Sequence, residues 1–187
     1  MNPNDLMKTA QDNLKKNVEH LENELKKMRT GRANPGMLDG VMVEAYGVPT
    51  PLNQVASITV PESQLLQLTP FDPNNLQVIT QSIRDNQSLG LNPTDDGRII
   101  RLPIPPLTEE RRKEIVKQLG VKTEESMIRM RNIRHEARES AEKLKKNKDI
   151  GEDDFGRFEK QLDEAIHDYK TKIDALANAK EKEIMTV

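Results

Sequence analysis

The sequence predicts an α+β protein in which a long three-helix bundle carries a small inserted α/β domain. Two observations predict this fold. Apolar residues recur at helical spacing over three long stretches, near residues 3–30, 108–148 and 151–185. Residues 31–106, between the first and second stretch, hold most of the prolines and glycines, with β-branched runs between them. A chain of 187 residues is long enough for two such units.

The stretch from Thr108 to Lys148 predicts a single helix about 60 Å long. The prolines of 103–106 prevent an earlier start, and Thr108 is a good N-cap. Apolar positions alternate in steps of three and four, which is typical of a seam that packs against other helices. The seam consists of Val116, Leu119, Met130, Ile133, Ala137 and Leu144. We expect the helix to continue through Gly120, with a kink there as the alternative.

The first and last helices carry seams of the same kind. Asn2 is a good N-cap with Pro3 at the first helical position, and this helix is expected to reach about Thr30. The last helix is expected from Gly151 to about Met185, with acidic residues in its first turn. Three such helices with short breaks predict an antiparallel-type three-helix bundle.

The inserted segment predicts strands at 41–46, 55–60, 65–68 and 98–102 and one short helix that Asp72 caps. We expect a bundle domain of residues 1–30 and 107–187 and an inserted domain of residues 31–106. The two connections, near 30–31 and 103–106, are expected to act as hinges; a rigidly docked insert is the alternative. The hinge residues are Thr30, Gly31, Pro103, Pro105 and Pro106.

Three arginines follow one face of the central helix. Arg131, Arg134 and Arg138 occur at i, i+3 and i+7, and no acidic residue lies between Met127 and His135. Two interpretations are open. The stripe is either a solvated charged face or a phosphate-binding face, since guanidinium groups match the geometry of phosphate oxygens.

The composition excludes several classes of function. A net charge of −2 and a pI near 6.0 exclude a generic polyanion binder, so any contact with nucleic acid must come from a local cluster. The absence of Cys excludes disulfides, thiolate metal sites and cysteine nucleophiles. The three His residues are expected on three different helices, and the carboxylates give no sign of a catalytic pair. We therefore expect no catalytic residue, metal or cofactor.

The sequence has neither a signal peptide at its start nor an apolar run as long as a membrane span. We therefore expect a cytoplasmic protein.

Several short motifs together point to a known family. They are Arg29-Thr30-Gly31-Arg32-Ala33, Leu38-Asp39-Gly40, Tyr46-Gly47 before Pro49-Thr50-Pro51-Leu52, Leu89-Gly90-Leu91-Asn92-Pro93, Pro103 to Arg112, and Arg131-Asn132-Ile133-Arg134. Through them the chain resembles ribosome recycling factor over essentially its whole length, and Pro105 to Arg112 is the most specific part. Asn34 and Gly151 depart from this pattern, because serine is expected at both positions.

The resemblance implies an L-shaped molecule in which a flexible double hinge joins the bundle to a small β/α/β domain. It implies a factor that binds the post-termination ribosome and, with elongation factor G and GTP, separates the subunits so that mRNA and deacylated tRNA leave. The bundle would lie against large-subunit rRNA, the small domain would face the elongation factor, and the factor itself would hydrolyse nothing. The family's functional arginines map onto Arg131 and Arg134, which favours the phosphate-binding interpretation.

We therefore expect RNA-binding residues at Arg29, Arg32, Arg129, Arg131, Arg134 and Arg138. Two other functions are open from the residues alone. One is a scaffold whose bundle binds other helical proteins, and the other is an enzyme with its site where the two domains meet. We expect a monomer, with a dimeric coiled coil as the alternative.

Overall fold

The computed structural model describes residues 2–186 and divides into two compact units. One unit is built from the two ends of the chain, residues 1–25 and 114–187, and the other from residues 26–113. The predicted fold class, a three-helix bundle with a small inserted α/β unit, is confirmed. Within residues 2–186, every helix is too short or too polar to span a lipid bilayer.

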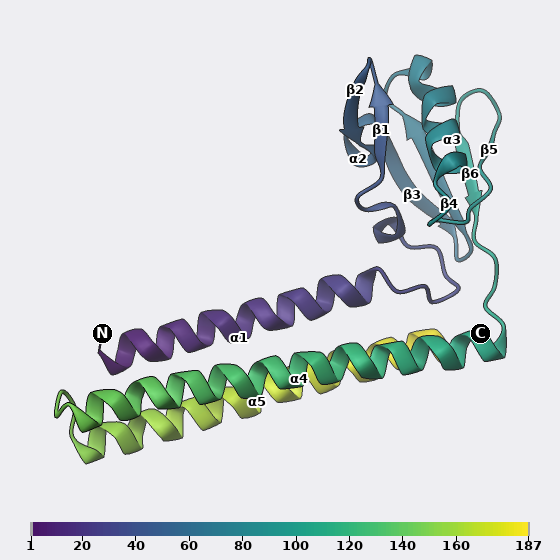
Figure 1. The fold of residues 1–187 in the computed structure, drawn as a ribbon. Helices are drawn as coiled ribbons and strands as arrows, with labels where there is room; N and C mark the ends of the chain where they lie inside the picture. Colours follow the sequence, from purple (N-terminus) through teal and green to yellow (C-terminus); the bar gives the residue numbers. More distant parts are fainter. Residues whose placement is uncertain (1, 187) are drawn as a thin grey trace. The chain divides into compact units, whose positions relative to one another are not determined.

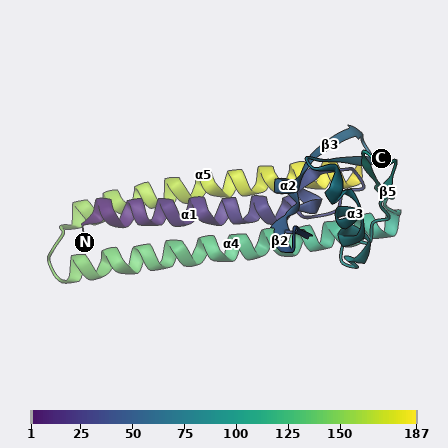
Figure 2. The ribbon, with the colours of Figure 1, turned by 90° about the horizontal axis from the view of Figure 1, so that it is seen from above.

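The bundle consists of α1 (Pro3–Lys26), α4 (Glu109–Lys146) and α5 (Glu152–Met185). Figures 1 and 2 show α1 and α5 running in the same direction and α4 running against both. Asn2 caps α1 as predicted, since its Oδ1 accepts from the Asp5 backbone N–H at 2.9 Å. The helix ends at Lys26, four residues earlier than predicted. Thr30, which follows the end of the helix, is only 4% exposed and is therefore buried outside α1.

α4 begins as predicted and continues through Gly120 without a break. Thr108 Oγ1 accepts from the Arg111 backbone N–H at 3.2 Å, which confirms the N-cap. The predicted seam is only partly correct: Leu119, Met130 and Ala137 are buried, whereas Val116, Ile133 and Leu144 are half-buried. The buried set also includes Ile115, Ser126 and Ala141. A helix that packs against two neighbours buries a wider stripe than the narrow seam of a coiled coil.

The inserted unit contains a hairpin and a four-stranded antiparallel sheet. β1 (Met42–Ala45) pairs with β2 (Val48–Pro51). β3 (Ala56–Glu62), β4 (Leu65–Pro70), β6 (Ile100–Pro103) and β5 (Thr94–Asp95) form the sheet in that order. The helices of this unit are η1 (Pro35–Leu38), α2 (Leu52–Val55), η2 (Pro73–Asn75) and α3 (Leu76–Asp85). The predicted strands are confirmed with shifted ends.

The core of the inserted unit lies between α3 and the sheet (Figure 1). Ile79 and Ile83 of α3 are completely buried, as are Leu66, Leu68 and Ile100 of β4 and β6. Three short elements, β2, α2 and β5, were not predicted. β2 carries Pro49 and Pro51, which argue against a strand in sequence, but an edge strand of a two-stranded hairpin tolerates proline.

Candidate nucleic-acid interface

The predicted arginine stripe lies on α4, close to α5. The side chains of Arg131, Arg134 and Arg138 are 63%, 47% and 53% exposed. A helix holds residues at i, i+3 and i+7 on one side with fixed spacing, because each residue advances the helix by about 1.5 Å. The structure therefore presents three guanidinium groups in a row over about 10 Å of a rigid element.

Each of these arginines has an acidic partner, which the sequence analysis did not anticipate. Arg134 Nε lies 2.8 Å from Asp163 Oδ1, and Arg138 Nε lies 2.6 Å from Glu159 Oε1. Arg131 pairs with Glu124 on its own helix. The stripe is therefore charged and exposed, but its arginines are paired with carboxylates. The stripe is an edge along which α4 arginines alternate with carboxylates, and we call Arg131, Arg134 and Arg138 the arginine edge.

The pairs with α5 follow from the antiparallel packing of the two helices. Arg134 and Arg138 are four residues apart on α4, and their partners Asp163 and Glu159 are four residues apart on α5 in the opposite order. Matching these two spacings across antiparallel helices could have found both pairs. The hydrogen bond and the charge of Glu159 raise the pKa of Arg138 above its ordinary value, so this side chain stays charged.

The geometry leaves the arginines able to bind phosphate. In Arg134 and Arg138 the Nε–H group donates the hydrogen bond to the carboxylate, which occupies one edge of the planar guanidinium. A guanidinium carries five N–H donors, so its terminal nitrogens can still form a two-pronged contact. Exposed ion pairs are worth only about 0–1 kcal/mol, so the exchange of a carboxylate for an RNA phosphate costs little.

The other predicted RNA-binding arginines lie elsewhere. Arg129 lines a small hollow of about 20 Å³ between α1 and α4, beside the ion pair of Glu24 and Lys122. Arg29 and Arg32 belong to the inserted unit. The Arg29 guanidinium donates to the backbone carbonyl oxygens of Ser88 and Leu89, which gives it a structural role there. The structure thus brings three of the six predicted residues together.

The predicted hinge residues fall into two groups. Pro103 is the last residue of β6, and the next backbone N–H, that of Ile104, donates to Gln64 O at 2.8 Å, so the sheet reaches into the predicted connection. Pro105 and Pro106 are exposed and belong to no helix or strand. Gly31 has φ +77°, and a Cβ at this position would lie 3.3 Å from Leu107 Cγ. The two connections therefore contact each other at Gly31 and Leu107.

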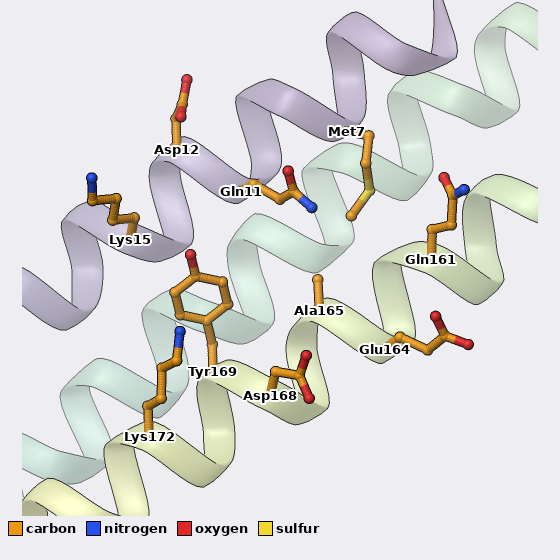
Figure 3. Close-up of a pocket in the computed structure, with 10 residues that line it drawn as sticks. All are labelled: Met7, Gln11, Asp12, Lys15, Gln161, Glu164, Ala165, Asp168, Tyr169 and Lys172. Atoms are coloured by element: carbon orange, nitrogen blue, oxygen red, sulfur yellow. The ribbon is translucent and has the colours of Figure 1, made fainter.

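The largest hollow described in the bundle is an open groove of about 690 Å³ between α1 and α5 (Figure 3). Its charged lining residues have both signs, with Asp12 and Lys15 from α1 and Glu164, Asp168 and Lys172 from α5. Lys172 Nζ lies 4.5 Å from the centroid of the Tyr169 ring. All three carboxylates are exposed to solvent, so the groove lacks the desolvation that tunes catalytic acids and bases. Among the described residues, no three His, Asp or Glu side chains are grouped so that they could hold a metal ion.

Comparison with known proteins identifies the family. A family model described as ribosome recycling factor matches residues 21–185. The chain belongs to the ribosome recycling factor family. The ribosome-recycling factor of Corynebacterium jeikeium is 44% identical over 183 residues, which cover 98% of each chain.

Solved structures of ribosome recycling factors agree over the full length. A solution structure of the ribosome recycling factor is 40% identical and has a TM-score of 0.81, covering 100% of this chain and 99% of the other. The second is the T. thermophilus ribosome recycling factor, described with the E. coli elongation factor G as bound to the E. coli post-termination complex. It is also 40% identical, with a TM-score of 0.69 and full coverage of both chains.

Proposed function

We propose that this protein recycles ribosomes: it binds the post-termination ribosome and, with elongation factor G and GTP, separates the subunits so that mRNA and deacylated tRNA are released. The observation that carries the proposal is the full-length similarity to a recycling factor described on the post-termination complex together with elongation factor G. GTP is hydrolysed by the elongation factor, and this protein needs no catalytic residue or cofactor of its own. Its place of action is the cytoplasm.

The bundle anchors the protein to large-subunit rRNA through the arginine edge. The three guanidinium groups are exposed and held at fixed spacing on a 38-residue helix. Contacts with the phosphate backbone dominate the affinity of proteins for folded RNA. Because neighbouring carboxylates balance much of this charge, the edge favours an RNA surface whose phosphates match the arginine spacing over polyanions in general.

The connections allow the inserted unit to move while the bundle stays anchored. Residues 27–32 and 105–108 lie outside the helices and strands, and they are short. A pair of adjacent connections restricts rotation to an axis that passes through both. If the elongation factor pushes on the inserted unit, that unit would then rotate about this axis while the bundle stays bound to the ribosome.

Cosedimentation with purified large ribosomal subunits at several salt concentrations tests the RNA contact. We expect Arg134→Ala to weaken binding about five- to tenfold and to reduce its salt dependence, because one phosphate contact is lost. Thermal unfolding should change little, since an exposed ion pair carries little stability. The matched control is Arg157→Ala, which removes another exposed arginine paired with a carboxylate on the bundle. Equal behaviour of both variants in affinity and salt slope would refute the assignment.

A second experiment tests the hinge. Deletion of one residue from each connection, Gly31 and Pro105, should block subunit splitting while sedimentation with ribosomes is retained. Splitting is measured by light scattering with elongation factor G and GTP. Loss of binding and splitting to the same degree would argue against a hinge and in favour of general damage to the fold.

A further inference from the structure

The inserted unit exposes two aromatic side chains at one corner. Tyr46, in the turn between β1 and β2, is 76% exposed, and Phe71, just after β4, is 67% exposed. They are two of only five aromatic residues in the chain. The Tyr46 hydroxyl donates to the Asp72 carboxylate, which brings the hairpin turn beside the segment that contains Phe71. Val48, 60% exposed, belongs to the same hairpin. We call Tyr46, Val48, Phe71 and Asp72 the aromatic corner.

The backbone at Tyr46 is unfavourable for a tyrosine. Ala45 pairs with Val48, so Tyr46 and Gly47 form a two-residue hairpin turn. Both have positive φ, 53° and 75°, as a type I′ turn requires. Asn, Asp or Gly fits the first position of such a turn, whereas a bulky residue there is strained by about 1–2 kcal/mol. The turn alone therefore does not explain the tyrosine.

The local structure around Phe71 is complete without its ring. The backbone N–H of Phe71 donates to Val55 O at 3.0 Å, and any residue except proline can make this bond. Asp72 Oδ1 accepts from the Asn74 backbone N–H at 2.9 Å and so caps η2. A phenylalanine that is 67% exposed adds little buried apolar area, whereas aromatic residues are typical anchors in protein–protein interfaces.

The charge of this part of the chain selects the kind of partner. From Ala33 to Ile83 the sequence contains no Lys, Arg or His. The only charged residues in the segment are Asp39, Glu44, Glu62 and Asp72. An RNA surface needs cations against its phosphates, and the segment that carries the corner offers only carboxylates. A protein surface with an apolar pocket bordered by Lys or Arg side chains complements both the rings and the acids.

We propose that the aromatic corner docks onto a basic protein surface, with Tyr46 and Phe71 as anchors in an apolar pocket and the carboxylates of Glu44 and Asp72 facing its Lys or Arg rim. The proposal rests on the proposed function, because that partner is encountered on the post-termination ribosome. The protein thereby makes two chemically different contacts there. The arginine edge binds RNA, and the aromatic corner binds protein.

The functional test uses full-length variants in the splitting reaction with purified post-termination ribosomes, elongation factor G and GTP. We expect Tyr46→Asn combined with Phe71→Ser to reduce splitting about tenfold or more, in line with the loss of interface anchors. Asn suits the positive φ, so the thermal midpoint should not fall. Tyr46→Phe is the control: it loses only the bond to Asp72 and should keep splitting within about twofold. Splitting by the double variant equal to wild type would overturn the proposal.

The chemical test identifies the partner. A benzophenone amino acid replaces Phe71 in the full chain, and the complex on the same ribosomes is irradiated. The control carries the probe at Glu62, the last residue of β3, which pairs with Leu65 at the start of β4. Phe71 follows the other end of β4, about 20 Å away for a six-residue strand. We expect position 71, but not position 62, to crosslink to a protein at a peptide with Lys or Arg beside apolar residues. A crosslink to RNA, or to an acidic peptide, would overturn the proposal.

The two tests also separate this inference from the proposed function. If the wild-type protein neither cosediments with ribosomes nor splits them, the proposed function fails. If the wild type splits ribosomes and the double variant does so equally well, only the aromatic corner is refuted.

Discussion

The arginine edge and the aromatic corner differ in the kind of side chain that each exposes. At the arginine edge, cations are abundant, and each is held by a carboxylate such as Asp163 or Glu159. At the aromatic corner, cations are absent over a segment of 51 residues, Ala33–Ile83, and exposed rings take their place. If both proposals hold, this difference explains how a chain with a net charge of only −2 can bind both RNA and protein. The basic surface lies on the bundle and the aromatic surface on the inserted unit, so the charges of one surface do not oppose the binding partner of the other.

The largest expected effect tests whether the two units are also separate in stability. Leu66 in the insert and Leu14 in the bundle are both completely buried. Leu66→Ala should destabilise the insert by about 2–5 kcal/mol, because the truncation leaves a cavity in a packed core. The insert should then unfold at lower urea concentration while most of the helical circular dichroism remains. Leu14→Ala should instead lower the helical transition.

Urea titrations followed by circular dichroism and by probes placed in each unit check this prediction. A single transition that both variants shift equally would mean that the units unfold together. In that case the two units, and the surfaces they carry, would not be independent of each other.

A substitution at the first connection should have a smaller effect. Gly31→Ala places a Cβ at φ +77° and 3.3 Å from Leu107 Cγ, so both backbone strain and crowding oppose it. We expect a loss of about 1–3 kcal/mol. Gly97→Ala is the matched control, because φ there is +85° and nothing lies within 4 Å of the added Cβ. The difference in unfolding free energy between the variants measures the contact of the two connections. No difference would mean that Leu107 moves aside at no cost.

Much of the fold could be predicted because its signals are local. Helix caps such as Asn2 and Thr108 depend on residues within one turn, and so do the apolar seams. β2 could not be predicted, because its prolines are acceptable only at an edge that the sequence does not show.

The candidate site was harder to predict, because its geometry depends on residues far apart in the chain. The partners of Arg134 and Arg138 lie 29 and 21 residues further along, so their pairing depends on how α4 and α5 pack. The sequence alone therefore places the three arginines on one helix face but does not show which carboxylates pair with them. The RNA contacts of these arginines stay a prediction.

Removal of an acidic partner sharpens the description of the arginine edge. Asp163→Asn takes away the carboxylate that holds Arg134 Nε at 2.8 Å and adds one unit of positive charge to the edge. If this carboxylate competes with RNA phosphate, affinity for large ribosomal subunits should rise about two- to fivefold, the equivalent of about 0.4–1 kcal/mol. Cosedimentation measures the effect, and Asp154→Asn, which frees Arg157, is the control. Weaker binding would show that the carboxylate positions the arginine.

The smallest expected effect concerns the one ion pair between arginine and carboxylate described in the sheet of the inserted unit. Asp96 Oδ1 accepts the backbone N–H groups of Arg98 and Ile99, and Oδ2 lies 3.0 Å from Arg101 Nη1. The two backbone hydrogen bonds, followed by the one from Arg101, lower the pKa of this carboxyl from its ordinary value. A lowered folded pKa gives stability that is present above the unfolded pKa, about 3.9, and is lost as the pH falls through the folded pKa.

Asp96→Asn should therefore unfold with a shallower loss of stability below about pH 4 than the wild type. Nuclear magnetic resonance titration of the Asp96 carboxyl should give a midpoint below that of a free aspartate. At the arginine edge, the acids that pair with α4 meet side chains, whereas here backbone N–H groups contribute most to the shift. A high salt concentration, which screens exposed side-chain pairs, should thus weaken binding by the arginine edge and leave the Asp96 midpoint largely in place. A midpoint that rises to the ordinary value in salt would show that Arg101, and not the turn, holds the charge.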